Sequence, residues 1–212
     1  MLFCYCHDLI HFHRSKKALP LHRAIPVMSM AKDAGMILSE FILLGIGGRE
    51  LSEENAIQTA KALNVIQPDF IRVHATGIKP ESKLGEFVRD GSFTLQSEEE
   101  IVVEQKLFLQ QLQEMNSYYV NEHIINLLLE VRGSLRTEKQ KMLSTIDRFL
   151  NMPLDERLLF AVGRRLNIFF FLDDLKKPEL HKKAEESLKK ILEKEPKVDF
   201  AALCNYVRQS QI

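Results

Sequence analysis

The sequence feature that most constrains the fold is an apolar run that ends in three closely spaced glycines. The run at positions 41–44 is followed by Gly45, Gly47 and Gly48, and the acidic start of a helix comes directly after them. This order is typical of a buried strand that leads into a tight turn. Glycine allows positive φ and close backbone approach there. Neither Gly-x-Gly-x-x-Gly nor the phosphate-loop pattern is present, so the glycines alone assign no ligand.

A helix and a second strand are predicted to follow the glycines. Ser52 stands at the N-cap position, and Glu53 and Glu54 fall in the first turn, where carboxylates stabilise the positive helix end. The helix is expected to stop before Pro68, and the apolar run at 70–73 forms the next strand. Two strands joined by a helical crossover lie parallel, so this alternation indicates an α/β barrel or a doubly wound sheet.

A third strand is predicted after another helix. Ser97 and Glu100 form a capping box, which starts that helix. The strand at 117–120 then leads into a polar segment that contains His123 and Asn126. Because parallel α/β folds keep their sites at the carboxyl ends of strands, these side chains are candidates for a site.

The rest of the chain is predicted to be helical. Thr137 and Gln140 repeat the capping-box arrangement before an apolar helical face, and from Met152 onward only helical periodicity is present. The lysines of the last helices alternate with glutamates, which is typical of a solvated helix face.

Composition excludes several classes of protein. The 212 residues contain 29 basic and 29 acidic side chains, so the net charge gives no reason to expect nucleic acid or an anionic membrane as partner. No apolar segment approaches the roughly 20 residues of a membrane span, and the N-terminus lacks the apolar region of a signal peptide. Three cysteines do not make a disulfide framework. We therefore predict a cytoplasmic protein with no membrane or nucleic-acid partner.

Metal-ligating side chains gather at the N-terminus. They are Cys4, Cys6, His7, His11 and His13. Structural zinc sites usually space their cysteines by two to four residues, and a single residue separates Cys4 from Cys6. We therefore assign no metal ligand there, and a zinc or iron site stays the alternative hypothesis.

Four segments of the chain carry a resemblance to a known family. They are Ala34–Gly48, Asn64–Val73, the loop through Lys79 and Pro80, and Tyr118–Asn126. Together they resemble the C-terminal half of radical S-adenosylmethionine proteins, in particular the group related to oxygen-independent coproporphyrinogen oxidase. The likeness runs from about Ile25 to Leu150.

The resemblance implies an α/β fold that is part of a barrel. Residues 25–150 would form half of a TIM-like barrel of the radical S-adenosylmethionine type, with parallel strands and outer helices. Residues 1–24 would form an irregular N-terminal segment, and residues 151–212 an all-helical C-terminal tail.

The resemblance also implies where a site would lie. Gly45, Gly47 and Gly48 match the glycines beside the adenine of the cofactor. Residues that match positions on the substrate side are Glu40, next to Ser39 in the first strand, Arg72, His123 and Asn126. No residue of the chain is assigned a catalytic or metal-ligating role.

The chain departs from the family at the iron-sulfur cluster. The family holds a [4Fe–4S] cluster on Cys-x-x-x-Cys-x-x-Cys and uses it to cleave S-adenosylmethionine reductively. This triplet is absent from the sequence, together with the early strands that would carry it. We therefore expect the C-terminal portion of such an enzyme, without cluster or radical chemistry of its own. The alternative is a non-catalytic α/β binding or scaffold module derived from that fold.

A partial barrel leaves an exposed sheet edge. The strand over residues 37–44 would lack the neighbour that a full barrel supplies, and unpaired edge strands invite association. Three candidates could cover it: the Met1–Leu21 segment, a second copy of the chain in a homo-oligomer, or a separately encoded N-terminal half.

Overall fold

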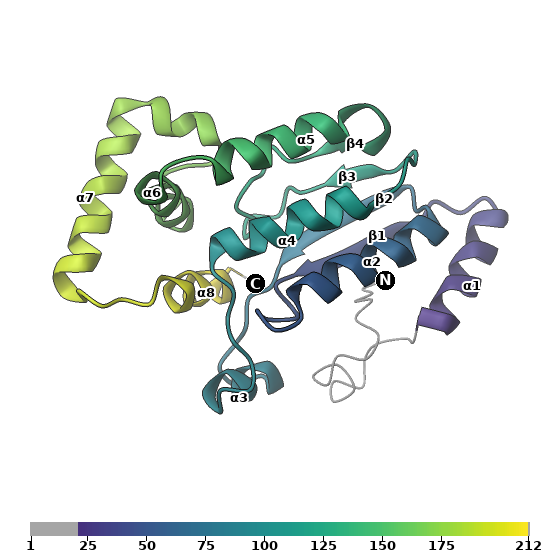
Figure 1. Cartoon of the computed structure of the whole chain (residues 1–212), viewed down its shortest axis with the longest axis horizontal. Helices are drawn as coiled ribbons and strands as arrows, with labels where there is room; N and C mark the ends of the chain where they lie inside the picture. Colours follow the sequence, from purple (N-terminus) through teal and green to yellow (C-terminus); the bar gives the residue numbers. More distant parts are fainter. Residues whose placement is uncertain (1–20, 212) are drawn as a thin grey trace.

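The computed structural model describes the backbone of residues 21–211 and the side chains of residues 25–211. The fold is mixed α/β and predominantly helical, with one small open sheet (Figure 1). The elements are α1 (Leu21–Asp33), β1 (Ser39–Leu44), α2 (Ser52–Ile66), β2 (Phe70–Ala75), α3 (Lys83–Arg89), α4 (Glu98–Gln111), β3 (Tyr118–Val120), β4 (Gly133–Ser134), α5 (Leu135–Leu150), α6 (Leu154–Arg165), the 3₁₀ helix η1 (Leu172–Lys176), α7 (Pro178–Lys194) and α8 (Phe200–Ser210).

The sheet has the order β1-β2-β3-β4. The pairs β1–β2 and β2–β3 are parallel, which confirms the predicted strand–helix–strand alternation. Arg72 of β2 stands between Phe41 of β1 and Val120 of β3 in the register. The short strand β4 adds to β3 antiparallel and was not predicted. Within the described residues β1 is an edge strand.

Helices cover one face of the sheet. Figure 1 shows α2, α4 and α5 side by side on this face, and α1 contacts α2. Because crossovers between parallel strands are right-handed, two crossovers that advance the same way place their helices on the same face. Every second residue of β1 and β2 is buried against these helices, and the main core forms there. The buried apolar side chains of the two strands are Ile42, Leu44, Ile71, Val73 and Ala75.

The observed helix starts agree only partly with those predicted from the sequence. The capping box of Ser97 and Glu100 is present. The predicted box of Thr137 and Gln140 is wrong, because α5 begins at Leu135 directly after β4 and both residues lie inside it. Ser52 is the first residue of α2, and no side chain caps this helix.

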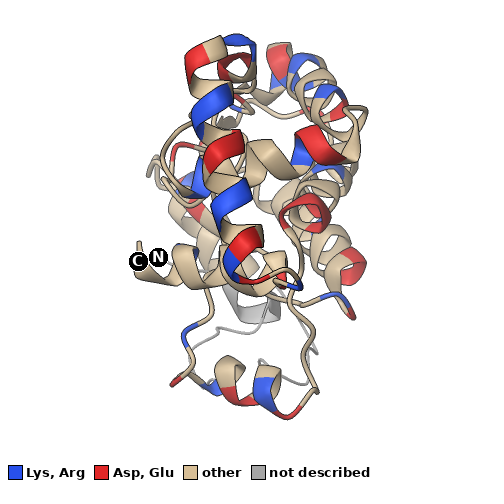
Figure 2. Cartoon of the chain, turned by 90° about the vertical axis from the view of Figure 1, so that its left-hand side faces the viewer, with Lys and Arg blue, Asp and Glu red and all other residues tan. Residues whose placement is uncertain are grey.

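The region after α5 contains only helices within the described residues. The helix α6 contacts α7 and α8, and Figure 1 shows α7 and α8 at the end of the molecule remote from α1. Figure 2 shows basic and acidic residues interleaved along α7. The helix α8 is tied to the segment after β2: Asn205 Oδ1 accepts from the Ile78 N–H at 2.8 Å, and Asn205 Nδ2 donates to the Ile78 carbonyl at 3.0 Å.

None of the helices within residues 21–211 combines the length and the hydropathy that a bilayer span requires.

Candidate functional site

The face of the sheet turned away from α2, α4 and α5 carries both polar and apolar side chains of the strands. We call it the open face. Its residues alternate with the buried ones and are only half-buried. On β1 and β2 they are Ser39, Phe41, Leu43, Phe70, Arg72 and His74.

Arg72 is held in place on the open face by its neighbours. Its Nε donates a hydrogen bond to Ser39 Oγ at 3.0 Å. The guanidinium carbon lies 6.0 Å from the ring centroid of Phe41 and 5.7 Å from that of Phe70, which is within reach of a cation–π interaction. These contacts fix the position of a positive charge on a half-buried surface.

Two histidines lie side by side next to Arg72. The ring centroids of His74 and His123 are 4.2 Å apart, and Phe41 meets His74 edge to face at 5.3 Å. Burial, the neighbouring His123 and the charge of Arg72 lower the pKa of His74 to about 4, and burial also lowers the pKa of His123. The His74 ring is therefore neutral at pH 7 and can donate one hydrogen bond and accept another. In His123 the Nδ1 atom already accepts from the Ile125 N–H at 3.4 Å, which leaves Nε2 for a ligand.

Asn126 has a structural role behind this pair. Its Oδ1 accepts from the Ala75 N–H at 2.7 Å, and its Nδ2 donates to the Val73 carbonyl at 2.6 Å and to Asn121 Oδ1 at 2.5 Å. The side chain is buried and continues the hydrogen bonding of β2 where β3 has ended. It thereby holds the 121–126 segment, which carries His123, against β2.

The glycine turn after β1 closes around a carboxylate of the chain itself. Both carboxylate oxygens of Glu104, on α4, accept from the Gly45 N–H at 3.3 Å. Ser52 Oγ donates to Glu104 at 2.9 Å, and Asn55 Nδ2 donates to it at 2.6 Å. Burial raises the pKa of Glu104, although these hydrogen bonds oppose the shift.

The space beside the glycines is filled by other parts of the chain. A Cβ on Gly47 would lie 2.8 Å from the Leu51 carbonyl oxygen, and one on Gly48 would lie 3.0 Å from the Thr94 carbonyl oxygen. Gly48 also has a φ of +63°. Internal packing therefore explains the need for glycine at Gly47 and Gly48. The predicted cofactor contact of Gly45, Gly47 and Gly48 stays a prediction.

The structure brings together only part of the predicted site. Arg72 and His123 both adjoin His74, on the open face. Glu40 does not join them, because it lies on the helix-covered face and is 3% exposed. Sequence reasoning missed His74, although its position two residues after Arg72 places both side chains on the same face of a strand.

The described residues offer no ligand set for an iron-sulfur cluster. Among the described side chains of residues 25–211, no three His, Cys, Asp or Glu are grouped so that they could hold a metal. Cys204 is buried, and burial, more than its charged neighbours, raises its thiol pKa to about 12. The N-terminal Cys4, Cys6, His7, His11 and His13 lie outside the described residues.

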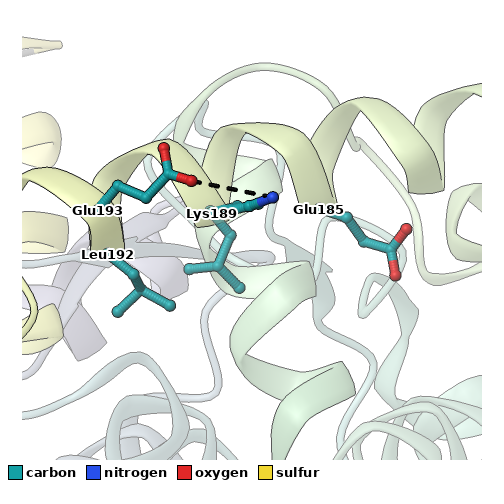
Figure 3. Close-up of a pocket in the computed structure, with 5 residues that line it drawn as sticks. Glu185, Lys189, Leu192 and Glu193 are labelled. Carbon is teal, nitrogen blue, oxygen red and sulfur yellow. Dashed lines mark ion pairs between the residues drawn. The ribbon is translucent and has the colours of Figure 1, made fainter.

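Two surface hollows lie away from the open face. Figure 3 shows the first, of about 410 Å³, on one side of α7, where Lys189 pairs with Glu193 at 3.9 Å. Its other lining residues are Glu185, Leu188 and Leu192. The second, of about 520 Å³, lies between the end of α4 and the start of α5. Neither contains a residue of the predicted site.

No family model, no curated protein and no solved structure matches the chain.

Proposed function

We propose that residues 25–150 are the substrate-facing part of an α/β barrel of the radical S-adenosylmethionine type, and that the open face lines the interior of that barrel. The observation that carries the proposal is the distribution of side chains over the sheet. Helices cover one face, whereas Arg72, His74 and His123 gather on the other. In a barrel the outer helices and the inner side chains are separated in this way.

The role proposed for this chain is binding and orientation. The guanidinium of Arg72, fixed by Ser39, would attract an anionic or polar part of a substrate. The neutral ring of His74 would donate and accept hydrogen bonds beside it, and His123 would contribute its Nε2 atom. Because the described residues do not fit an iron-sulfur cluster, no reductive step is assigned to them.

The edge strand β1 is where the barrel would be completed. Its outer N–H and C=O groups have no strand partner within residues 21–211. A second copy of the chain, or a polypeptide that carries the remaining strands, would pair there by strand addition. Action in the cytoplasm, without nucleic acid, belongs to the same proposal.

Titration with S-adenosylmethionine tests the proposal. Amide resonances of the ¹⁵N-labelled full chain are followed by NMR as the ligand is added. We expect saturable shifts at the glycine turn of residues 45–48, where the resemblance places the adenine, and smaller shifts on the open face around Arg72 that are lost in Arg72→Gln. Arg136→Gln is the matched control, because this exposed arginine lies on α5. Shifts that are absent, or that are unchanged in Arg72→Gln, would refute the role of the open face.

One observation favours a second candidate, a non-catalytic binding or scaffold module derived from the same fold. Glu104 already occupies the Gly45 amide, so the glycine turn offers this donor to no ligand. If the chain is such a module, we expect no resonance shifts with S-adenosylmethionine. We also expect a dimer in sedimentation velocity and protection of β1 from hydrogen exchange. A monomer with fast exchange at β1 would contradict it.

A further inference from the structure

A buried charged cluster joins three helices at the end of the sheet where β3 leads into the 121–126 segment. Glu98, in the first turn of α4, pairs with Arg165 of α6 through two hydrogen bonds of 3.0 and 2.6 Å and with Arg208 of α8. All three side chains are buried. Burial alone would raise the pKa of Glu98, but the two guanidinium groups hold it below its usual value.

Arg164 lies next to this cluster without a carboxylate of its own. Its Nη2 donates to the Ile124 carbonyl at 2.8 Å, and its Nε and Nη1 have no hydrogen-bond partner among the described residues. The side chain is 1% exposed. Buried polar atoms are rarely left unpaired, because each costs about 1–3 kcal/mol. Burial and the charge of Arg165 lower the pKa of Arg164 to about 10, although Glu98 and Glu130 oppose the shift.

The nearby carboxylates do not neutralise Arg164. Glu98 is engaged by Arg165 and Arg208. Glu130 Oε1 accepts from the Leu172 N–H at 2.8 Å, and no ion pair within 4.0 Å joins Glu130 to Arg164 in the described part of the chain. Glu98 is thus shared by Arg165 and Arg208, and Glu130 pairs with Arg148 at 3.8 Å, so within the described residues the Arg164 guanidinium has no carboxylate of its own.

A single aromatic ring stands over this guanidinium at the surface. The Arg164 guanidinium carbon lies 5.4 Å from the ring centroid of Phe170. Phe170 is 41% exposed, and Phe171 and Ile124 are also exposed. The exposed ring of Phe170 is therefore part of the cover between the Arg164 guanidinium and solvent.

We propose that Arg164 binds an oxyanion, the carboxylate or phosphate group of a small ligand, which enters by displacing the ring of Phe170. The free Nε and Nη1 can each donate to an anion oxygen, and such charge-assisted hydrogen bonds are the strong ones. The exposed Phe170, Phe171 and Ile124 would contact an apolar part of the same ligand. Through Ile124 the site adjoins the segment after β3, on the side of the sheet where open α/β folds bind ligands. The site does not depend on the proposed function.

Binding of simple anions to the full chain tests the proposal. Sodium phosphate and sodium acetate are titrated separately against sodium chloride at matched ionic strength, and the arginine Nε–H resonances are followed by NMR. We expect saturable shifts of Arg164 Nε–H with at least one anion, and the two titrations separate phosphate from carboxylate as the preferred group. Loss of a charge-assisted hydrogen bond in Arg164→Gln should weaken binding by about tenfold or more. Arg136→Gln, at an exposed position of α5, should leave the anion affinity unchanged.

Two substitutions at Phe170 keep the test decisive if Arg164→Gln fails to fold. Phe170→Ala removes the ring, so binding should tighten and the association rate should rise. Phe170→Trp enlarges it, so association should slow. The proposal is overturned if neither anion binds saturably to the wild-type chain or to Phe170→Ala. Equal affinity in wild type, Phe170→Ala and Phe170→Trp would also overturn it, because it would mean an adventitious ion only.

Discussion

The ring centroids of His74 and His123 lie 4.2 Å apart, and the two ring planes make an angle of 31°. The guanidinium of Arg72 lies on the same face of the sheet. Two histidines at this distance cannot both take up the second proton that makes the ring cationic without repelling each other. The arrangement is therefore stable as a neutral pair, and its response to acid is the most direct way to observe it.

Acid should destabilise the protein through His74. Its pKa is about 4 in the folded chain and 6.5 in the unfolded one, so the unfolded state binds the proton more tightly. The stabilisation is complete above pH 6.5 and is lost as the pH falls toward 4. Because the ring is half-buried, we expect a loss of about 1–2 kcal/mol after solvent screening. Urea denaturation at several pH values measures it, and His74→Phe should flatten the profile. An NMR titration of His74 near pH 6.5 would contradict the prediction.

Loss of the buried carboxylate at Glu98 should be severe. Glu98→Gln leaves Arg165 and Arg208 buried without a countercharge, which typically costs about 3–5 kcal/mol. The matched control is Glu122→Gln, which breaks the exposed pair with Arg132 and should change the stability by less than about 0.5 kcal/mol. Equal midpoints of urea denaturation for the two variants would show that the buried cluster does not stabilise the fold.

Removal of the Asn126 amide should weaken the sheet. In Asn126→Leu the Ala75 N–H and the Val73 carbonyl lose their buried partner, for an expected cost of about 2–4 kcal/mol. Hydrogen exchange at Ala75 should accelerate. Asn116→Ala is the control, since Asn116 is exposed and only accepts from Arg136. An unchanged hydrogen-exchange rate at Ala75 would mean that the Asn126 side chain does not contribute to the hydrogen bonding of β2.

Two glycine substitutions separate crowding from backbone strain. Gly47→Ala places a Cβ 2.8 Å from the Leu51 carbonyl oxygen, so overpacking of about 1–3 kcal/mol is expected. Gly91 has a φ of +80° with nothing within 4 Å of an added Cβ, so Gly91→Ala should cost only the strain of about 1–2 kcal/mol. Thermal unfolding compares the two. A smaller effect at Gly47 would mean that the turn relaxes around the new methyl group.

Local sequence signals predicted the elements that carry long apolar runs or complete caps. The strands β1, β2 and β3 and the capping box of Ser97 were found in this way. The strand β4 was missed because Gly133 and Ser134 form a two-residue strand with no apolar run. Its antiparallel turn places Leu135 in the core, so α5 starts there and not at the expected box of Thr137.

Part of the site could have been predicted from alternation along the strands, and part depended on contacts between residues distant in sequence. Glu40 is a neighbour of Ser39 in sequence, but alternation along the strand places it on the other face. Glu98 and Arg208 pair although they are 110 positions apart, and no periodicity within either helix predicts this contact. Only the packing of α6 and α8 against the start of α4 makes these charges neighbours.

The hydrogen bonds and the ion pair that α8 makes have a consequence for biosynthesis. Asn205 completes the hydrogen bonds of Ile78 across 127 positions, and Arg208 completes the pairing of Glu98. A ribosome adds about 5–20 residues per second, so Ile78 and Glu98 wait for several seconds or longer for these partners. During this interval the Ile78 backbone and the Glu98 carboxylate lack the partners that α8 supplies, so the part of the fold that α8 covers stays open to water until this helix emerges from the ribosome.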